Sequence, residues 1–283
     1  MSQSFQFDTI GTAWEITSVE QLSETLKNQI RERTEEFDKN YSRFREDSLV
    51  TQWAREAGEY NLPSDANALF AFYKKLYDVS AGLVTPLIGK TMEQAGYDAD
   101  YSLKAKQLTS PPQWQEAISV GPTKLIVKHP VLLDFGAAGK GYLVDIIAHL
   151  LYTNGVDQFC VNAGGDMLVR HFPQTIGLED PDDTARVLGT VEVSNGALCA
   201  SAGNRRAWGE FHHIINPQIL RSVERVKATW VRADTALLAD GVATALFFVS
   251  PDILLKTFAF EYAMIENDDM TYSHNFKAQF FTE

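Results

Sequence analysis

The sequence is short of cysteine, of basic charge and of long apolar runs, and each shortage excludes a class of protein. Only two cysteines, Cys160 and Cys199, occur in 283 residues, too few for a disulfide framework or a zinc site. Both lie in apolar stretches and are predicted to be buried. No apolar run is long enough for a membrane-spanning helix, so we expect no membrane insertion. The 25 basic residues are outnumbered by 37 acidic ones, which argues against a protein that coats nucleic acid or an anionic membrane.

Three familiar sequence signals are missing as well. The first residues, Met1 to Phe5, have no basic segment followed by an apolar one, so no secretory signal is visible and we expect a cytoplasmic protein. No Gly-x-Gly-x-x-Gly follows a predicted strand, which excludes the dinucleotide fingerprint of the Rossmann fold. Gly89-Lys90-Thr91 ends like a P-loop, but its first glycine would fall at Val84.

What is present is the composition of a folded protein, with 45% apolar and 22% charged residues. Apolar periodicity predicts helices and strands in an irregular order. A capping box at Ser18 and Gln21 precedes a long helix with an apolar stripe to Tyr41. Three further helices are predicted over 64–77, from the glycine-rich turn 136–141 through 150, and over 235–249. Strands are predicted over 5–16, 125–127, 131–135, 159–161, 167–169 and 228–233, with a hairpin over 189–200 around Asn195-Gly196 and a surface loop over 180–183. Because helices and strands do not alternate strictly, we expect an α+β or mixed α/β fold.

Three groups of residues could carry chemistry. The turn from Gly136 to Gly141 opens a helix whose free N–H groups could bind an anion, although a tight strand-to-helix turn looks the same. Asp240 and Thr244 lie four residues apart on a predicted helix, so both oxygens share one face. Such hard oxygens suit magnesium. The alternative is that Asp240 and Thr244 are simply two polar residues on a helix, with no metal. His213 is either a general base or a histidine at the end of a strand.

The order of these pieces resembles the ApbE-type flavin transferases, also called FAD:protein FMN transferases. Seven stretches of the chain follow the family's motifs in the family's order: Ile10-Gly11-Thr12 for Met-Gly-Thr, 42–48 for Ser-Arg-Phe-x-x-x-Ser, 82–89 for Gly-Ala-Phe-Asp-Pro-Thr-Val-Gly, 134–145 for Asp-Leu-Gly-Gly-Ile-Ala-Lys-Gly-Tyr-Ala-Val-Asp, 162–166 for Asn-x-Gly-Gly-Asp, 213–217 for His-Ile-Ile-Asp-Pro, and 234–246 for Thr-Ala-x-x-Ala-Asp-Ala-Leu-Ala-Thr-Ala-Leu. Together they span nearly the whole chain.

The resemblance implies one body over residues 1–283, with the flavin nucleotide and a metal held between two lobes. It implies an enzyme that binds FAD and magnesium, transfers FMN to a Thr or Ser hydroxyl of an acceptor protein, and releases AMP. The acceptor would be a subunit of a flavin-dependent redox enzyme. Two alternatives stay open, a magnesium-dependent FAD pyrophosphatase that yields FMN and AMP, and a non-catalytic FAD-binding protein.

The resemblance also assigns roles to residues. The metal ligands would be Asp240, the Thr244 hydroxyl and the Ala137 carbonyl. His213 would be the base for the acceptor hydroxyl, a role that an unperturbed imidazole suits near neutral pH. The residues expected around the flavin nucleotide are Ile10, Leu83, Val84, Thr85, Asp134, Lys140, Gly164 and Gly165.

Several of these positions depart from the family pattern. Ile10 stands for a methionine, and Val84-Thr85 stand for Phe-Asp. Asn216 stands for the aspartate after the catalytic histidine, and 218–220 stand for Arg-Thr-Gly. We therefore expect the metal end of the site to be intact and the nucleotide and acceptor ends to be altered. His212 is expected to point away from His213 if this segment is a strand.

Overall fold

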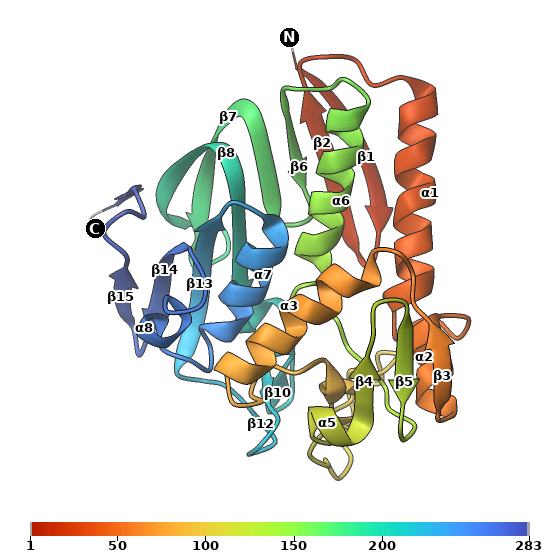
Figure 1. Ribbon diagram of the computed structural model, residues 1–283. Helices are drawn as coiled ribbons and strands as arrows, with labels where there is room; N and C mark the ends of the chain where they lie inside the picture. The colour runs from red at the N-terminus through yellow and green to blue at the C-terminus, as the bar shows by residue number, and fades with distance from the viewer. Residues whose placement is uncertain (1, 282–283) are drawn as a thin grey trace.

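The computed structural model describes residues 2–281 (Figure 1). Its helices are α1 (Glu24–Tyr41), α2 (Leu49–Arg55), α3 (Ala66–Val79), η1 (Pro86–Ile88), α4 (Gly89–Gln94), α5 (Trp114–Ala117), α6 (Gly139–Thr153), η2 (Gly203–Arg206), α7 (Ala236–Ala245) and α8 (Pro251–Leu254). Its strands are β1 (Gln3–Thr9), β2 (Thr12–Ser18), β3 (Gly58–Asn61), β4 (Ile118–Val120), β5 (Lys124–Val127), β6 (Phe159–Asn162), β7 (Met167–Glu179), β8 (Val187–Ala202), β9 (Ala207–Trp208), β10 (Phe211–His212), β11 (Ile215–Asn216), β12 (Arg221–Ser222), β13 (Val226–Ala233), β14 (Glu261–Glu266), β15 (Asp269–Tyr272) and β16 (Ala278–Phe280).

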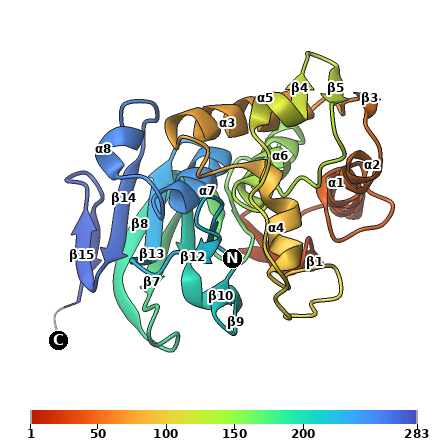
Figure 2. The ribbon, with the colours of Figure 1, turned by 90° about the horizontal axis from the view of Figure 1, so that it is seen from below.

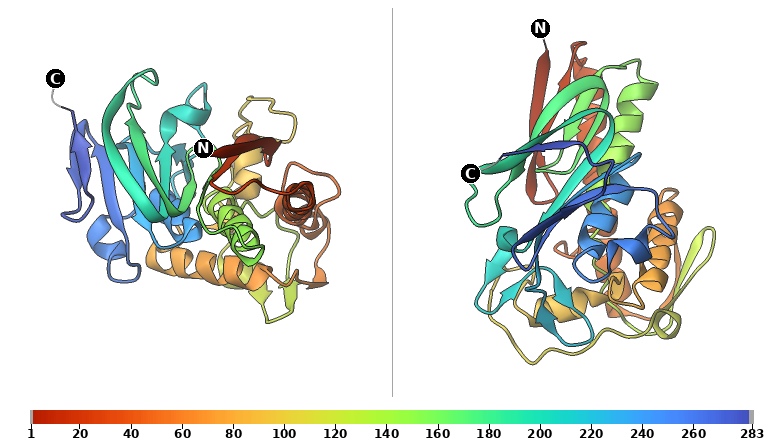
Figure 3. Two further views of the ribbon diagram at one scale, coloured as in Figure 1. Left: turned by 90° about the horizontal axis from the view of Figure 1, so that it is seen from above. Right: turned by 90° about the vertical axis from the view of Figure 1, so that its left-hand side faces the viewer.

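An antiparallel sheet is the centre of the fold. In residues 2–281 it has nine strands, ordered β1-β2-β6-β7-β8-β13-β14-β15, with β16 added to β8. The red β1 and the dark blue β15 are its two edges (Figure 3). The mixture of this antiparallel sheet with packed helices confirms the predicted α+β class.

Helices α1, α6 and α7 cover one face of the sheet (Figure 1). The helix α6 buries Leu143, Val144, Ile147 and Leu151 at helical spacing, so one continuous stripe faces the core. The stripe expected on α1 is buried as predicted, from Leu26 to Tyr41. Hydrophobic burial on this face therefore fixes where the first turns of α6 and α7 lie.

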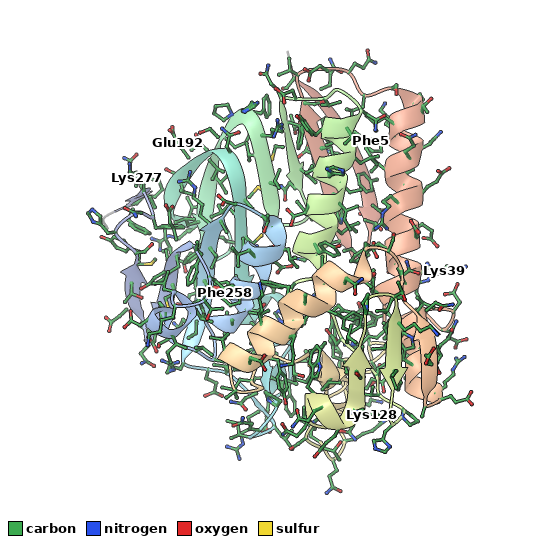
Figure 4. The ribbon with its side chains drawn as sticks, viewed as in Figure 1. Phe5, Lys39, Lys128, Glu192, Phe258 and Lys277 are labelled. Atoms are coloured by element: carbon green, nitrogen blue, oxygen red, sulfur yellow. The ribbon has the colours of Figure 1, made fainter. Side chains whose placement is uncertain are left out.

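The opposite face of the sheet has its own apolar cluster, built from β7, β8, β13, β14 and the C-terminal segment. Strand β13 is buried on both sides, with Trp230 in this cluster and Val231 in the main one. Exposed charged side chains such as Lys39, Lys128, Glu192 and Lys277 lie at the periphery, whereas Phe258 packs inward against Phe72 (Figure 4). The two buried cysteines predicted from the sequence belong to these cores.

A second lobe lies beyond α3. It contains the three-stranded sheet β3-β5-β4 with α2, α4 and α5. The short hairpins β9-β10 and β11-β12 lie between the main sheet and α4 (Figure 2). Met92 of α4, Trp208 of β9 and Ile215 of β11 share one small apolar cluster, which connects the two lobes on this side.

The N-terminal elements differ from their sequence-based prediction. Residues 5–16 form a hairpin and not one strand, because Ile10 and Gly11 both take positive φ and reverse the chain. The following helix begins at Glu24, because Ser23 and not Ser18 accepts the N–H of Leu26. The Ser18 hydroxyl instead donates to the carbonyl of Glu20.

Two further strand predictions are wrong. Residues 131–135 are buried but have no strand ladder, since Val131 N–H donates to Trp53 and Asp134 N–H to Pro86. Asn195-Gly196 does not form a hairpin turn: it lies inside β8, opposite a bulge in β7. There the Asn195 side chain accepts the N–H of His171, so the turn-forming residues are used for the bulge. The predicted surface loop at 180–183 is the true connection from β7 to β8.

Among the described residues, no helix is both long enough and apolar enough to cross a membrane.

Candidate active site

All site residues predicted from the sequence line one cavity of about 580 Å³ between the two lobes. They come from turns and element ends that are far apart in the chain. The set is Ile10, Leu83, Val84, Thr85, Asp134, Ala137, Lys140, Gly164, Gly165, His213, Asp240 and Thr244. The fold therefore brings together residues that lie far apart in the sequence. The roles expected for them stay predictions.

The glycine-rich turn before α6 forms one wall of the cavity. The Gly136 N–H donates to Asp134 Oδ1 over 2.7 Å, and Asp134 N–H donates to the Pro86 carbonyl over 2.7 Å. Any side chain at Gly141 would overlap the carbonyl of Ala236, because α6 and α7 touch at this position. This close approach sets the Asp240 side chain beside the first turn of α6.

Three hard oxygens meet where α6 and α7 touch. Asp240 Oδ2 accepts the Gly141 N–H over 2.8 Å, and the Thr244 hydroxyl donates to the Ala137 carbonyl over 3.4 Å. Burial raises the pKa of the Asp240 carboxyl, while Lys140 and the Gly141 N–H oppose that rise. Within residues 2–281 Asp240 makes no ion pair, and no group of three or more His, Cys, Asp or Glu side chains could hold a metal. A buried carboxylate, a hydroxyl and a carbonyl are nevertheless the donor types that magnesium takes, so these residues fit such an ion.

Lys140 is held by a carboxylate that the sequence analysis did not single out. It forms an ion pair with Asp166, which is completely buried. Gly164 and Gly165 just before it take φ of +65° and +108°, and a side chain at Gly164 would overlap the Thr12 hydroxyl. The signal was available: Asp166 ends the Asn-x-Gly-Gly-Asp motif, of which only the glycines were assigned.

His213 lies in the cavity wall in an electropositive, buried setting. The backbone N–H of His213 donates to the Arg206 carbonyl, and the ring Nδ1 is buried without a hydrogen-bond partner among the described residues. Burial lowers the pKa of the imidazole to about 3, and the positive charges of Arg206 and Lys140 add to the effect. The expectation of an unperturbed imidazole is therefore wrong: His213 is neutral throughout the physiological range.

The neighbours of His213 have structural tasks. His212 lies outside the cavity lining, as expected, with Nε2 2.8 Å from the Val223 carbonyl and Nδ1 accepting the Ile214 N–H. Asn216 Oδ1 accepts the N–H groups of Gln218 and Ile219. An aspartate at this position could accept the same two bonds, so the exchange of aspartate for Asn216 leaves the turn intact.

The buried His213 makes stability depend on pH. The unfolded chain binds a proton at this residue below about pH 6.5, while the folded chain stays neutral down to about pH 3. Stability is thus lost as the pH falls from 6.5, by about 1.4 kcal/mol per pH unit from this residue. We expect the free energy of unfolding of His213→Gln, measured with urea, to fall less between pH 6.5 and 4.5 than that of the unaltered protein. The difference should be about 1.4 kcal/mol per pH unit. Parallel pH dependences in the two proteins would contradict the burial of a neutral imidazole.

The sequence analysis also overlooked Arg43 and an aromatic group. Arg43 has a nearly fully buried side chain and belongs to the stretch 42–48, which follows the family motif Ser-Arg-Phe-x-x-x-Ser. Its Nε donates to Asp134, and its guanidinium lies 4.1 Å from the centre of the Phe44 ring. Phe44 and Tyr101 stack at 5.6 Å, and both line the cavity with Tyr97. Aromatic faces of this kind suit planar ring systems.

Comparison with known proteins gives a consistent family. A sequence model of the ApbE family matches residues 10–265. A protein of Rhodobacter capsulatus named FAD:protein FMN transferase is 29% identical over 184 residues, which cover 59% of this chain and only 35% of that protein. A Klebsiella pneumoniae protein of the same name is 22% identical over 277 residues, with 86% of this chain and 77% of that one covered. The structure of the flavin transferase ApbE from Vibrio cholerae superimposes with a TM-score of 0.80 at 20% identity, over 98% of both chains.

Proposed function

Because the chain belongs to the ApbE family, we propose that it is an enzyme that transfers FMN from FAD to a Thr or Ser hydroxyl of an acceptor protein. The reaction depends on magnesium and releases AMP. The acceptor is a subunit of a flavin-dependent redox enzyme, and residues 1–283 act as one unit. The observation that carries the proposal is the convergence of all predicted site residues on one cavity. A cytoplasmic location stays a prediction.

The cavity has the features that FAD requires. Its volume of about 580 Å³ lies within the usual range of small-molecule sites. The faces of Phe44, Tyr97 and Tyr101 offer stacking surfaces for a planar ring. In the first turn of α6 the N–H groups of Gly139 and Gly141 are bonded to the Phe135 carbonyl and to Asp240. The charge that favours a pyrophosphate beside the turn is therefore that of Lys140, which lines the cavity and is shared with Asp166.

Asp240, Thr244 and the Ala137 carbonyl are the groups that would hold magnesium. A magnesium ion bound there would neutralise the negative charge that develops on the pyrophosphate. His213 accepts the proton of the acceptor hydroxyl, which its neutral imidazole can do. The hydroxyl oxygen forms a bond to the FMN phosphorus, the pyrophosphate P–O bond breaks, and AMP leaves with the bond electrons. The low pKa of its imidazole makes His213 a weak base, and the two negative charges of a bound FAD pyrophosphate would raise that pKa.

The test follows AMP release and acceptor mass after incubation with FAD, magnesium and a candidate acceptor subunit. AMP together with an acceptor mass gain of one FMN supports the transferase. AMP without labelling would favour the pyrophosphatase, and intact bound FAD would favour a binding protein. Omitting magnesium, with EDTA added, is expected to stop AMP release.

Ile10 links the stability of the chain to this proposed function. It is β-branched yet has φ of +43°, in a two-residue turn where Asn-Gly would be preferred, and its side chain lines the cavity. We expect Ile10→Asn to raise the free energy of unfolding by about 1 kcal/mol, because asparagine tolerates this conformation. The same change is expected to weaken FAD binding, because it removes apolar surface from the cavity.

Urea unfolding and FAD fluorescence quenching measure the two effects. Ile10→Met is the matched control: it replaces one apolar side chain in the cavity by another, so FAD affinity should be retained. A less stable Ile10→Asn protein would show that the turn stores no appreciable strain.

A further inference from the structure

We propose that Arg43 is a positioning residue for the Ala137 carbonyl, and through that carbonyl for the cation site; the inference rests on the proposed function. The family resemblance assigns no role to Arg43 and places Asp134 among the residues expected around the flavin nucleotide. The contacts of both residues point to a shared structural task instead.

Arg43 is fixed in place by several partners. Its side chain is only 2% exposed. The Nε group donates to Asp134 Oδ2, and Nη1 donates to the Tyr97 carbonyl over 2.7 Å. The guanidinium lies between two rings, 4.1 Å from the centre of Phe44 and 5.0 Å from that of Tyr97. A planar guanidinium can meet these partners together, whereas the single ammonium of lysine cannot.

Asp134 passes this constraint to the turn. Its Oδ2 is taken by Arg43 and its Oδ1 by the Gly136 N–H over 2.7 Å. Each carboxylate oxygen therefore already accepts from a donor inside the protein. The Gly136 N–H belongs to the peptide between Phe135 and Gly136, so the Asp134 carboxylate holds the backbone directly before Ala137.

The other end of the same turn is held separately. The Tyr73 hydroxyl accepts the Ala138 N–H over 3.1 Å, and Tyr73 is completely buried. The Ala137 carbonyl belongs to the same peptide as this N–H, and it accepts from the Thr244 hydroxyl at 3.4 Å. Loss of the Arg43 anchor frees only one side, so the turn should loosen without the chain unfolding.

The test measures cation binding and not turnover. Mn²⁺ is titrated into the full chain, with and without FAD, and the free ion is followed by its EPR signal. We expect Arg43→Lys to weaken Mn²⁺ binding by about tenfold or more, as is usual when a residue behind a metal ligand is changed. Asp134→Asn should weaken it similarly, and the double variant should be no worse than either single one, because both act through one path.

Arg33→Lys is the matched control. Arg33 forms a partly buried ion pair with Asp65, and neither residue lines the cavity. The Mn²⁺ affinity of Arg33→Lys should therefore equal that of the unaltered protein. Wild-type affinity in Arg43→Lys, or additive losses in the double variant, would overturn the inference. Should Arg43→Lys fail to fold, as judged by circular dichroism, the near-isosteric Asp134→Asn carries the test alone. Failure of the unaltered protein to bind Mn²⁺ at all would overturn the proposed metal site itself, and with it this inference.

Discussion

Replacing Asp240 with asparagine is expected to lower metal-dependent AMP release by about a thousandfold or more, as befits several kcal/mol of charge stabilisation by a bound cation. Asp240 is the only carboxylate among the three proposed ligands, so the change removes the main attraction for magnesium. Asparagine keeps an oxygen that can accept the Gly141 N–H, which an alanine would leave unpaired inside the protein. The fold should therefore persist, and rates across a magnesium titration are the measurement.

Asp234→Asn is the matched control for this experiment. Asp234 precedes α7 in the same segment and is exposed, so its loss changes the net charge by the same amount without altering the oxygen cluster. We expect this control to retain full activity at every magnesium concentration. If Asp240→Asn responded to magnesium as the unaltered protein does, Asp240 would not be a ligand.

Removing the imidazole of His213 is expected to slow transfer by about 10²- to 10⁴-fold, the usual contribution of a positioned base. The side chain lines the same cavity as Asp240, Thr244 and Ala137, and a base of this kind would contact the attacking hydroxyl and not FAD. FAD affinity should therefore be almost unchanged in His213→Ala. Acceptor labelling and AMP release at saturating FAD and magnesium measure the effect.

The control at His212 must respect what that ring does. His212 links the hairpins through the Val223 carbonyl and the Ile214 N–H, so an alanine there would also cost stability. His212→Asn keeps polar atoms at this position and should remain nearly as active as the unaltered protein. Equal activities for His213→Ala and His212→Asn would remove His213 from the mechanism and leave the cation site as the source of catalysis.

The sequence predicted best where one local pattern decides the outcome. The apolar stripes of α1 and α6 were found because burial at helical spacing leaves a clear record. The Ile10 turn was missed because isoleucine is the wrong residue for positive φ, so no turn residue marks the first position. Asn195-Gly196 misled for the opposite reason, since a strong turn signal was used for a bulge. The buried run 131–135 looks like a strand, and only the absence of a neighbouring strand excludes it.

The site shows the same division. The sequence motifs predicted which residues line the cavity, but they could not predict the contacts and pKa values of these residues. The low pKa of His213 is caused first by its burial and then by the nearby charges of Arg206 and Lys140, and all of these arise only through the fold. The same holds for the Arg43 guanidinium on Asp134, a contact across 91 positions of the chain. Electrostatics of this kind arises from tertiary contacts, and no local pattern encodes it.

The distribution of the cavity wall along the chain has a consequence for folding and turnover in the cell. Its residues begin in the β1–β2 turn and end on α7, so no contiguous fragment contains the site. We expect such a cavity to form late in folding, because contacts between distant parts of the chain form only after the entropy cost of closing long loops has been met. A nascent or proteolytically nicked chain would therefore hold FAD poorly, and bound FAD would protect only the complete molecule from unfolding. If the chain binds FAD as proposed, binding would therefore report that the residues from the β1–β2 turn to α7 have folded together.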